Sequence, residues 1–454
     1  MAKKILKKSL SKYEVIIGLE IHVQLKTKSK MFCGCKNDPN ETRPNLNVCP
    51  VCLGHPGTLP VINQKAFEFV LKTAKALNCQ IAEISQFSRK SYFYPDLPKG
   101  YQISQYELPL AVKGELNKIK IRRIHLEEDT GRLIHQKSKT LIDFNRSGTP
   151  LMELVTEPEI KSSEQAKRFC QDLQIILRYL DVSSADMEKG EMRCEVNISL
   201  KNKGPKVEIK NLNSFKAVEK SIEYEIKRQT KAKKIIQETR GWDQNKQITF
   251  SQRTKESAHD YRYFPEPDLP MLQLSAFSFQ LSEMPQEKKT RFLQEYKLPE
   301  QDIKILIQNK NLADYFEQIV SELEDKSLIK LANNYLLKIK DDFKKITPEN
   351  FAEFISLINQ GEISSSAADV VLREMQKTGG DPSQIIGEKD LRQTSDLDNI
   401  IQKVIKNNPK PVQDYQAGKQ EALKFLIGQI MKETKGKANP QEARKLLIKL
   451  LASS

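Results

Sequence analysis

Residues 18–25 read GLEIHVQL, a stretch in which apolar and polar residues alternate without interruption. This period of two predicts a β-strand that buries one face and presents Glu20, His22 and Gln24 together on the other. A carboxylate beside an imidazole makes that face a candidate for chemistry. An alternative stays open, in which Glu20 and His22 only line a strand face exposed to water.

Two further carboxylates lie in similarly apolar surroundings. Glu128 closes the run IHLEE, and Glu153 lies inside the run LMELV. A buried carboxylate is unfavourable unless a counter-charge, a hydrogen bond or a metal compensates it. Carboxylate oxygens with one imidazole suit Mg²⁺ or Mn²⁺ acting on a phosphorylated substrate. The predicted ligand set is Glu20, His22, Glu128 and Glu153.

The composition indicates a protein that binds a polyanion. The chain has 454 residues, with 74 Lys and Arg against 59 Asp and Glu, and a formal net charge of +15. A basic surface attracts phosphates through a salt-sensitive interaction, so nucleic acid is the partner that fits best. A cytoplasm of high ionic strength could also favour a basic protein generically, and this alternative stays open.

The sequence also bears on location. No apolar run approaches the roughly 18 residues of a membrane-spanning helix, so no membrane partner is expected. Residues 1–12 are rich in lysine but have no apolar segment behind them, so we expect a basic N-terminal extension rather than a secretory signal. We therefore expect a cytoplasmic protein, in which cysteines bind metal more readily than they form disulfides.

Two cysteine pairs have the spacing of a zinc knuckle. They are Cys33-Gly-Cys35 and Cys49-Pro-Val-Cys52. Four thiolates would complete a tetrahedral structural Zn²⁺ site with no open position for catalysis. Reduced cysteines without metal are the alternative, and His55 could replace one thiolate although its surroundings are typical of a turn. The other cysteines are expected to be small core residues: Cys79, Cys170 and Cys194.

Two segments combine cations, aromatic rings and prolines. They are residues 89–102, RKSYFYPDLPKGYQ, and residues 260–270, DYRYFPEPDLP. The prolines exclude a regular helix or a central strand, so both segments are predicted to be shaped loops. Their cations could bind phosphates, and their rings could stack on a base or an aminoacyl ester. Loops closed by their own rings, with solvated lysines, are the alternative.

Strand-like and helix-like patterns follow one another in mixed order and then give way to charged, helical sequence. The predicted fold is α+β. We expect a mixed-sheet domain with the zinc knuckle at residues 13–280, an all-α helical domain at residues 281–395 and a small helical tail domain at residues 396–454.

Further motifs accompany GLEIHVQL in order along the chain. They are FCGC, CPVCLGHPG, RKSYFYPDLPKGYQISQ, RIHLEED, DFNRSGTPLMELVTEPE, EMRCEVNIS, EIKNLNSF, QETR and DYRYFPEPDLP. Together they resemble the B subunit of glutamyl-tRNA(Gln)/aspartyl-tRNA(Asn) amidotransferase, over nearly the whole chain. The resemblance implies that the mixed-sheet domain is a catalytic cradle.

The resemblance implies a two-step reaction on misacylated tRNA. ATP phosphorylates the side-chain carboxylate of the misacylated Glu or Asp, and ammonia then displaces phosphate to form the amide. The same four residues, Glu20, His22, Glu128 and Glu153, match the family's Mg²⁺ site.

The resemblance also suggests residues that bind phosphate or lie on the path of ammonia. The candidates are Lys90, Lys99 and Arg146. No Walker A sequence is present, so the use of ATP rests on the resemblance and on the acidic residues.

Ammonia must come from a partner, because the chain shows no local signature of a Ser or Cys nucleophile with its base. The resemblance implies an amidase-type A subunit, which is a glutaminase, and a small C subunit, so that the enzyme is a heterotrimer. The aminoacyl-tRNA itself is the third partner.

Basic side chains crowd the joint of a predicted helical hairpin in the tail: Lys432, Lys435, Lys437, Arg444 and Lys445. By analogy with the family, this joint binds tRNA. Solvated lysines near helix ends are the alternative.

Two other classes of function stay open on the sequence. One is a metal-dependent phosphatase or nuclease that uses the same acidic residues. The other is a non-catalytic, zinc-containing RNA-binding protein. Buried carboxylates argue against the second class, because a protein that only binds RNA gains nothing from them.

Overall fold

The computed structural model describes residues 13–254, 261–274, 277, 279–392, 397–434, 437–438 and 440–452. The predicted extension at residues 1–12 lies outside these ranges, as do Asp260 and Lys435. The chain divides into two compact units, with the boundary between Pro285 and Gln286.

The main sheet of the first unit is mixed. It has nine strands among the described residues, in the order β14-β13-β12-β11-β1-β10-β7-β6-β2. The predicted strand is part of β1 (Val15–Gln24), which lies at its centre. Neighbours are antiparallel except for the parallel pair β12 and β13. The other strands are β2 (Gln80–Ile81), β6 (Ala111–Leu116), β7 (Ile119–Glu128), β10 (Pro150–Thr156), β11 (Met192–Leu200), β12 (Val207–Leu212), β13 (Glu238–Asp243) and β14 (Ile248–Thr254).

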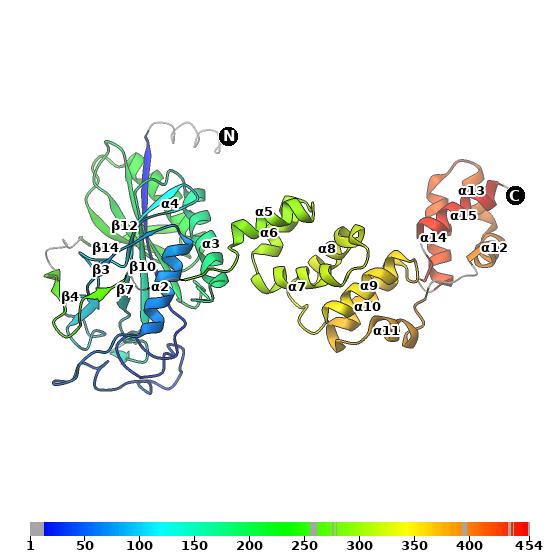
Figure 1. The fold of residues 1–454 in the computed structure, drawn as a ribbon. Helices are drawn as coiled ribbons and strands as arrows, with labels where there is room; N and C mark the ends of the chain where they lie inside the picture. The colour runs from blue at the N-terminus through cyan, green and yellow to red at the C-terminus, as the bar shows by residue number, and fades with distance from the viewer. Residues whose placement is uncertain are drawn as a thin grey trace. The chain divides into compact units, whose positions relative to one another are not determined.

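Alternation along β1 separates a core face from a polar face, as predicted. Leu19, Ile21 and Val23 are buried in the hydrophobic core, whereas Glu20 and His22 are only partly buried. Three helices lie along one side of the sheet (Figure 1): α2 (Gln64–Ala76), α3 (Ser163–Tyr179) and α4 (Phe215–Lys231). Their apolar side chains join the core under the sheet. The opposite face is therefore available for polar residues.

Three small sheets complete the first unit. The order β15-β4-β5 joins β15 (Phe264–Pro265), β4 (Ser88–Ser91) and β5 (Tyr101–Ser104). The two others pair β3 (Ile84–Ser85) with β16 (Leu272–Gln273) and β8 (Arg132–His135) with β9 (Thr140–Asp143).

The prediction of two separate loops needs a correction. The ends of the first segment form the strand pair β4 and β5, and the second segment adds to it, with Phe264 opposite Arg89. Only residues 92–100 form a connecting loop. The two prolines, Pro95 and Pro98, lie in this loop, where they interrupt no strand pairing.

The second unit is helical and has two hydrophobic cores. One core spans residues from Phe292 to Ile386, and the other spans residues from Leu397 to Leu451. The fold is thus α+β, as predicted. None of the described helices combines the length and the apolar character that crossing a membrane requires. The helices are α5 (Pro285–Glu295), α6 (Glu300–Ile307), α7 (Lys310–Glu322), η2 (Lys326–Leu328), α8 (Ile329–Lys338), α9 (Pro348–Asn359), α10 (Ser365–Thr378), α11 (Pro382–Glu388), α12 (Leu397–Asn407), α13 (Pro409–Gln416), α14 (Gln420–Glu433) and α15 (Pro440–Ala452).

Candidate metal centres

A cluster of imidazoles and carboxylates lies where β1, β10 and β7 run side by side. The strand register places His22 opposite Glu153, and Glu153 opposite His125. His22 Nε2 lies 3.4 Å from Oε2 of Glu153 and 3.5 Å from Oε1 of Glu127. His125 Nε2 lies 3.4 Å from the same oxygen of Glu153. Three adjacent strands thus bring together groups that are far apart in the sequence.

Burial and close charges shift the pKa values of the groups in this cluster. Burial acts to lower the pKa of His22, but its hydrogen bond to Glu153 and the charges of Glu153 and Glu127 raise it to about 9. Burial likewise opposes ionisation of Glu153, but His125 and His22 hold its pKa well below the ordinary value. Burial and repulsion from Glu153 raise the pKa of Glu20 to about 7. A divalent cation would satisfy the carboxylates without these protons.

Glu20 extends the cluster into a row across the sheet. Oxygen atoms of Glu20, Glu195 and Glu208 lie within 4.8 Å of one another. Lys210 Nζ lies 2.9 Å from Oε2 of Glu195 and 3.6 Å from Oε1 of Glu208. The hydroxyl of Thr239 donates to Oε2 of Glu208 at 3.0 Å. This lysine therefore neutralises the outer end of the row.

Three of the four predicted magnesium ligands come together. Ligand atoms of Glu20, His22 and Glu153 lie within 4.8 Å of one another, and those of His125, Glu127 and Glu153 form a second such group. The donor set of carboxylate oxygens and imidazole nitrogens fits Mg²⁺ or Mn²⁺.

The structure does not bring the fourth predicted ligand, Glu128, into either group. Side chains alternate along β7, so Glu127 points to the cluster and Glu128 to the opposite side. Oε1 of Glu128 accepts hydrogen bonds from the backbone N–H of Ile103, at 3.0 Å, and from the ammonium of Lys99. The prediction chose Glu128 because it closes the apolar run. The same alternation would have selected His125 and Glu127, which the prediction missed, as it missed Glu195 and Glu208.

A cavity of about 1440 Å³ lies beside the row and is lined by Lys90, Tyr92, Thr239, Phe264 and also Lys210. Lys90 Nζ lies 4.8 Å from the ring centre of Tyr261 and 5.7 Å from that of Tyr92. Burial acts to lower the pKa of Lys90, but electrostatic interaction with Tyr263 and Glu127 raises it. The cavity thus combines cations with aromatic faces.

The other two candidate cations are already engaged. Lys99 is paired with Glu128, and both line a small cavity of about 60 Å³ next to Cys33 and Cys52. Arg146 donates to the carbonyl oxygens of Thr130, at 3.0 Å, and Gly131, at 2.6 Å. Arg146 therefore fixes the loop that follows β7.

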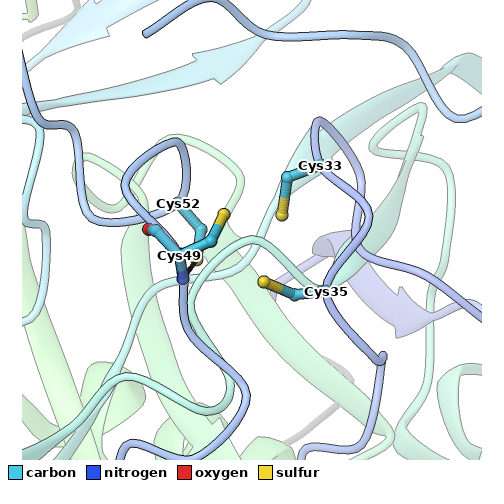
Figure 2. A group of neighbouring side chains, drawn as sticks. All are labelled: Cys33, Cys35, Cys49 and Cys52. Atoms are coloured by element: carbon cyan, nitrogen blue, oxygen red, sulfur yellow. Dashed lines mark hydrogen bonds between the residues drawn. The ribbon is translucent and has the colours of Figure 1, made fainter.

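The four knuckle cysteines converge (Figure 2). Their sulfur atoms lie within 4.8 Å of one another. The backbone N–H of Cys49 donates to Sγ of Cys52 at 3.2 Å. Hydrogen bonding with Cys33 lowers the pKa of Cys52 to about 5, against the effect of burial. Four sulfur donors in this arrangement fit a tetrahedral structural zinc ion.

The remaining predictions about Cys and His can be placed as well. His55 is not part of the sulfur group, and its backbone N–H donates to the carbonyl oxygen of Pro50 at 2.9 Å, within a turn. Cys170 and Cys194 are buried in the core, as predicted, and Cys79 packs against it.

Comparison with protein families gives two matches. Residues 15–280 match the GatB/GatE catalytic domain, and residues 314–451 match the GatB domain. The first match covers all the strands of the main sheet and both candidate metal centres.

Curated relatives match over nearly their whole length. The B subunit of aspartyl/glutamyl-tRNA(Asn/Gln) amidotransferase from Persephonella marina is 47% identical, over 97% of this chain and 99% of the relative. The protein of the same name from Thermotoga petrophila is 46% identical, again over 97% of this chain and 99% of the relative. That of Carboxydothermus hydrogenoformans is 45% identical, over 98% of this chain and 100% of the relative. The chain therefore belongs to the GatB/GatE family, together with these amidotransferase relatives.

Proposed function

We propose that this chain is the component of a tRNA-dependent amidotransferase that phosphorylates and amidates the aminoacyl-tRNA. The γ-phosphoryl group of ATP moves to the side-chain carboxylate of Glu or Asp esterified to tRNA, and ADP leaves. Ammonia then attacks the acyl phosphate, and inorganic phosphate leaves as the amide forms. The products are Gln-tRNA(Gln) or Asn-tRNA(Asn). The observation that supports this proposal most is the convergence of His22, Glu153 and Glu127, in a chain of this family.

Magnesium would be bound by Glu20, His22 and Glu153, with Glu127 close to the same ring nitrogen of His22 as Glu153. When bound, Mg²⁺ spreads the negative charge of the phosphoryl group during its transfer. Lys210 would keep the neighbouring acids of the row ionised and in place. This arrangement agrees with phosphoryl transfer, which depends on positioning and on charge stabilisation rather than on a protein nucleophile.

The large cavity would hold the reacting ends of ATP and tRNA. Lys90 and Lys210 would bind phosphate oxygens, because ammonium groups in a cavity attract polyanions. Tyr92 and Phe264 offer faces on which an adenine or the terminal base of tRNA can stack. Arg146 remains a candidate phosphate-binding residue, with two of its donors already used by the loop after β7.

Lys99 and Glu128 would serve the second step. The cavity that they line is small and polar, with room for molecules of the size of water or ammonia. We propose that this pair lines the path along which ammonia reaches the acyl phosphate. Ammonia would come from an amidase-type A subunit, and a small C subunit would complete a heterotrimer.

The cysteine cluster would hold a structural Zn²⁺, since four sulfur ligands leave no open position for catalysis. The basic joint between α14 and α15, with Lys432, Lys437 and Arg444, would bind tRNA. The protein would act in the cytoplasm, where aminoacyl-tRNA is made.

The test is a reconstituted reaction. The chain is combined with an A-type and a C-type partner, misacylated tRNA, ATP, Mg²⁺ and glutamine, and amidated aminoacyl-tRNA is measured together with ADP. We expect one ADP for each amide formed. Release of phosphate without amide would support the phosphatase class instead, and retention of tRNA with neither product would support the RNA-binding class.

A further inference from the structure

A lysine ammonium is buried against the cysteine cluster. Lys30 is 0% exposed, and its Nζ lies 3.8 Å from Sγ of Cys52 and 3.2 Å from the carbonyl oxygen of Phe144. Its backbone belongs to the same loop, because the N–H of Lys30 donates to the carbonyl oxygen of Cys35 at 3.0 Å. Contacts of both the backbone and the ammonium therefore keep Lys30 beside this sulfur.

A third segment closes over this contact. Gly148 has a positive φ of +83°, and a Cβ added there would lie 3.4 Å from Cδ of Lys30 and 3.5 Å from Cβ of Cys52. The backbone N–H of Met31 donates to the carbonyl oxygen of Gly148 at 2.7 Å. The lysine and the sulfur therefore share one enclosed position.

The ammonium of Lys30 forms no ion pair with a carboxylate among the described residues. Its polar contacts there are the sulfur of Cys52 and the carbonyl oxygen of Phe144. A buried ammonium is unfavourable unless an anion compensates it. Of the two contacts, only the sulfur can become an anion. A negatively charged cysteine cluster would therefore compensate the buried ammonium.

We propose that Lys30 is the counter-charge of the cysteine cluster and thereby sets how tightly the cluster holds its metal. This inference rests on the zinc binding proposed above. Four thiolates around a divalent cation leave an excess of negative charge. Because the thiols release protons as the metal enters, the site becomes more negative on loading, and a nearby cation favours the loaded state. Lys30 is not a ligand itself, since a charged ammonium has no lone pair.

The experiment measures zinc release from the full-length chain to a chelating dye. Wild type is compared with Lys30→Met, which keeps an unbranched side chain one atom shorter but removes the charge, and with Lys30→Arg, which keeps the charge. Lys28→Met removes the charge of an exposed lysine two residues earlier and is the matched control. We expect Lys30→Met to lower zinc affinity about 10- to 100-fold, the range found for residues around metal ligands. Lys30→Arg should stay close to wild type, and Lys28→Met should be indistinguishable from it.

A thermal measurement separates the charge from packing. The melting temperature of each variant is measured with and without zinc, and the increase on adding zinc should be smaller in Lys30→Met than in wild type. In a Cys52→Ser background, Lys30→Met should reduce this zinc-dependent increase in melting temperature little further, because the two residues act through one contact. An equal reduction of the zinc-dependent increase in both backgrounds would overturn the inference. A zinc affinity of Lys30→Met equal to that of wild type would also overturn it. If wild type itself binds no zinc, the proposed metal site fails first and the role of Lys30 fails with it.

Discussion

Glu127 and Glu128 are neighbours in the sequence but serve opposite sides of β7. Oε1 of Glu127 lies 3.5 Å from Nε2 of His22, within the imidazole and carboxylate cluster. Oε1 of Glu128 accepts a hydrogen bond from the backbone N–H of Ile103 at 3.0 Å and pairs with Lys99. Two adjacent carboxylates are therefore separated by the pleat of one strand.

This separation predicts different metal binding in two isosteric variants. Glu127→Gln should weaken the binding of Mn²⁺, used as a spectroscopic substitute for Mg²⁺, by at least about 10-fold, because a carboxylate beside His22 is lost. Glu128→Gln should leave Mn²⁺ affinity within experimental error. Electron paramagnetic resonance of free Mn²⁺ measures both. A loss of affinity in Glu128→Gln alone would restore the ligand set predicted from the sequence.

Asp129 should limit stability in acid. Burial opposes its ionisation, but the charges of Arg193 and Arg146 lower its pKa from 3.8 to about 2. Because the folded-state pKa is lowered, the ionised Asp129 stabilises the folded chain above pH 3.8, and this stabilisation is lost as the pH falls toward 2. The wild-type chain should thus lose about 2 kcal/mol of unfolding free energy over this range, and Asp129→Asn should lack that part of the loss. Urea denaturation at a series of pH values tests this. Parallel acid profiles for the two proteins would contradict it.

Gly54 should be required for the position of Lys99. Gly54 has a φ of +70°, and a Cβ there would lie only 2.5 Å from Cγ of Lys99. Gly57 has a similar φ of +84°, but a Cβ there would have no neighbour within 4 Å. Both alanine variants place a side chain at a positive φ, so a large difference in stability between them reports the clash. Gly54→Ala should lower the free energy of unfolding by about 1–3 kcal/mol more than Gly57→Ala.

The same pair of variants also tests the proposed ammonia path. We expect Gly54→Ala to reduce amidation with glutamine more strongly than formation of ADP, because Lys99 would move away from Glu128 while the metal cluster stays intact. Equal behaviour of the two variants in both assays would show that the knuckle does not position Lys99.

The tail should bind tRNA electrostatically. Residues from Leu397 to Leu451 have a hydrophobic core of their own, so removing residues 396–454 leaves the other cores intact. This deletion should weaken tRNA binding and reduce the slope of log affinity against log salt, because fewer phosphates are neutralised. Filter binding at several salt concentrations measures the slope. An unchanged slope would remove the tail from the tRNA interface.

Local patterns were enough to predict part of the site. Alternation around Glu20 and His22 identified a strand with one polar face, and the spacing of Cys33, Cys35, Cys49 and Cys52 identified a sulfur cluster. Both signals act within a few tens of residues, so no knowledge of the tertiary structure is required.

Other parts depend on pairing between distant strands. The register that places Glu153 opposite His22, and Glu195 opposite Glu20, is set by the whole sheet, and the sequence of each strand alone does not contain it. The pairing of Phe264 with Arg89 joins two segments of similar composition that are far apart in the sequence. It too depends on pairing between distant strands. The burial of Lys30 also could not be predicted from the sequence, because a lysine between Ser29 and Met31 is ordinarily exposed.

Transfer of phosphate in the absence of ammonia tests the central claim most directly. The complex is incubated with misacylated tRNA and ATP labelled in its γ-phosphate, without glutamine or ammonium, and label on the aminoacyl-tRNA is measured in wild type and His22→Ala. We predict labelled aminoacyl-tRNA with wild type and none with His22→Ala, while both proteins retain tRNA equally. Equal labelling by the two proteins would contradict the assignment of this cluster to phosphoryl transfer.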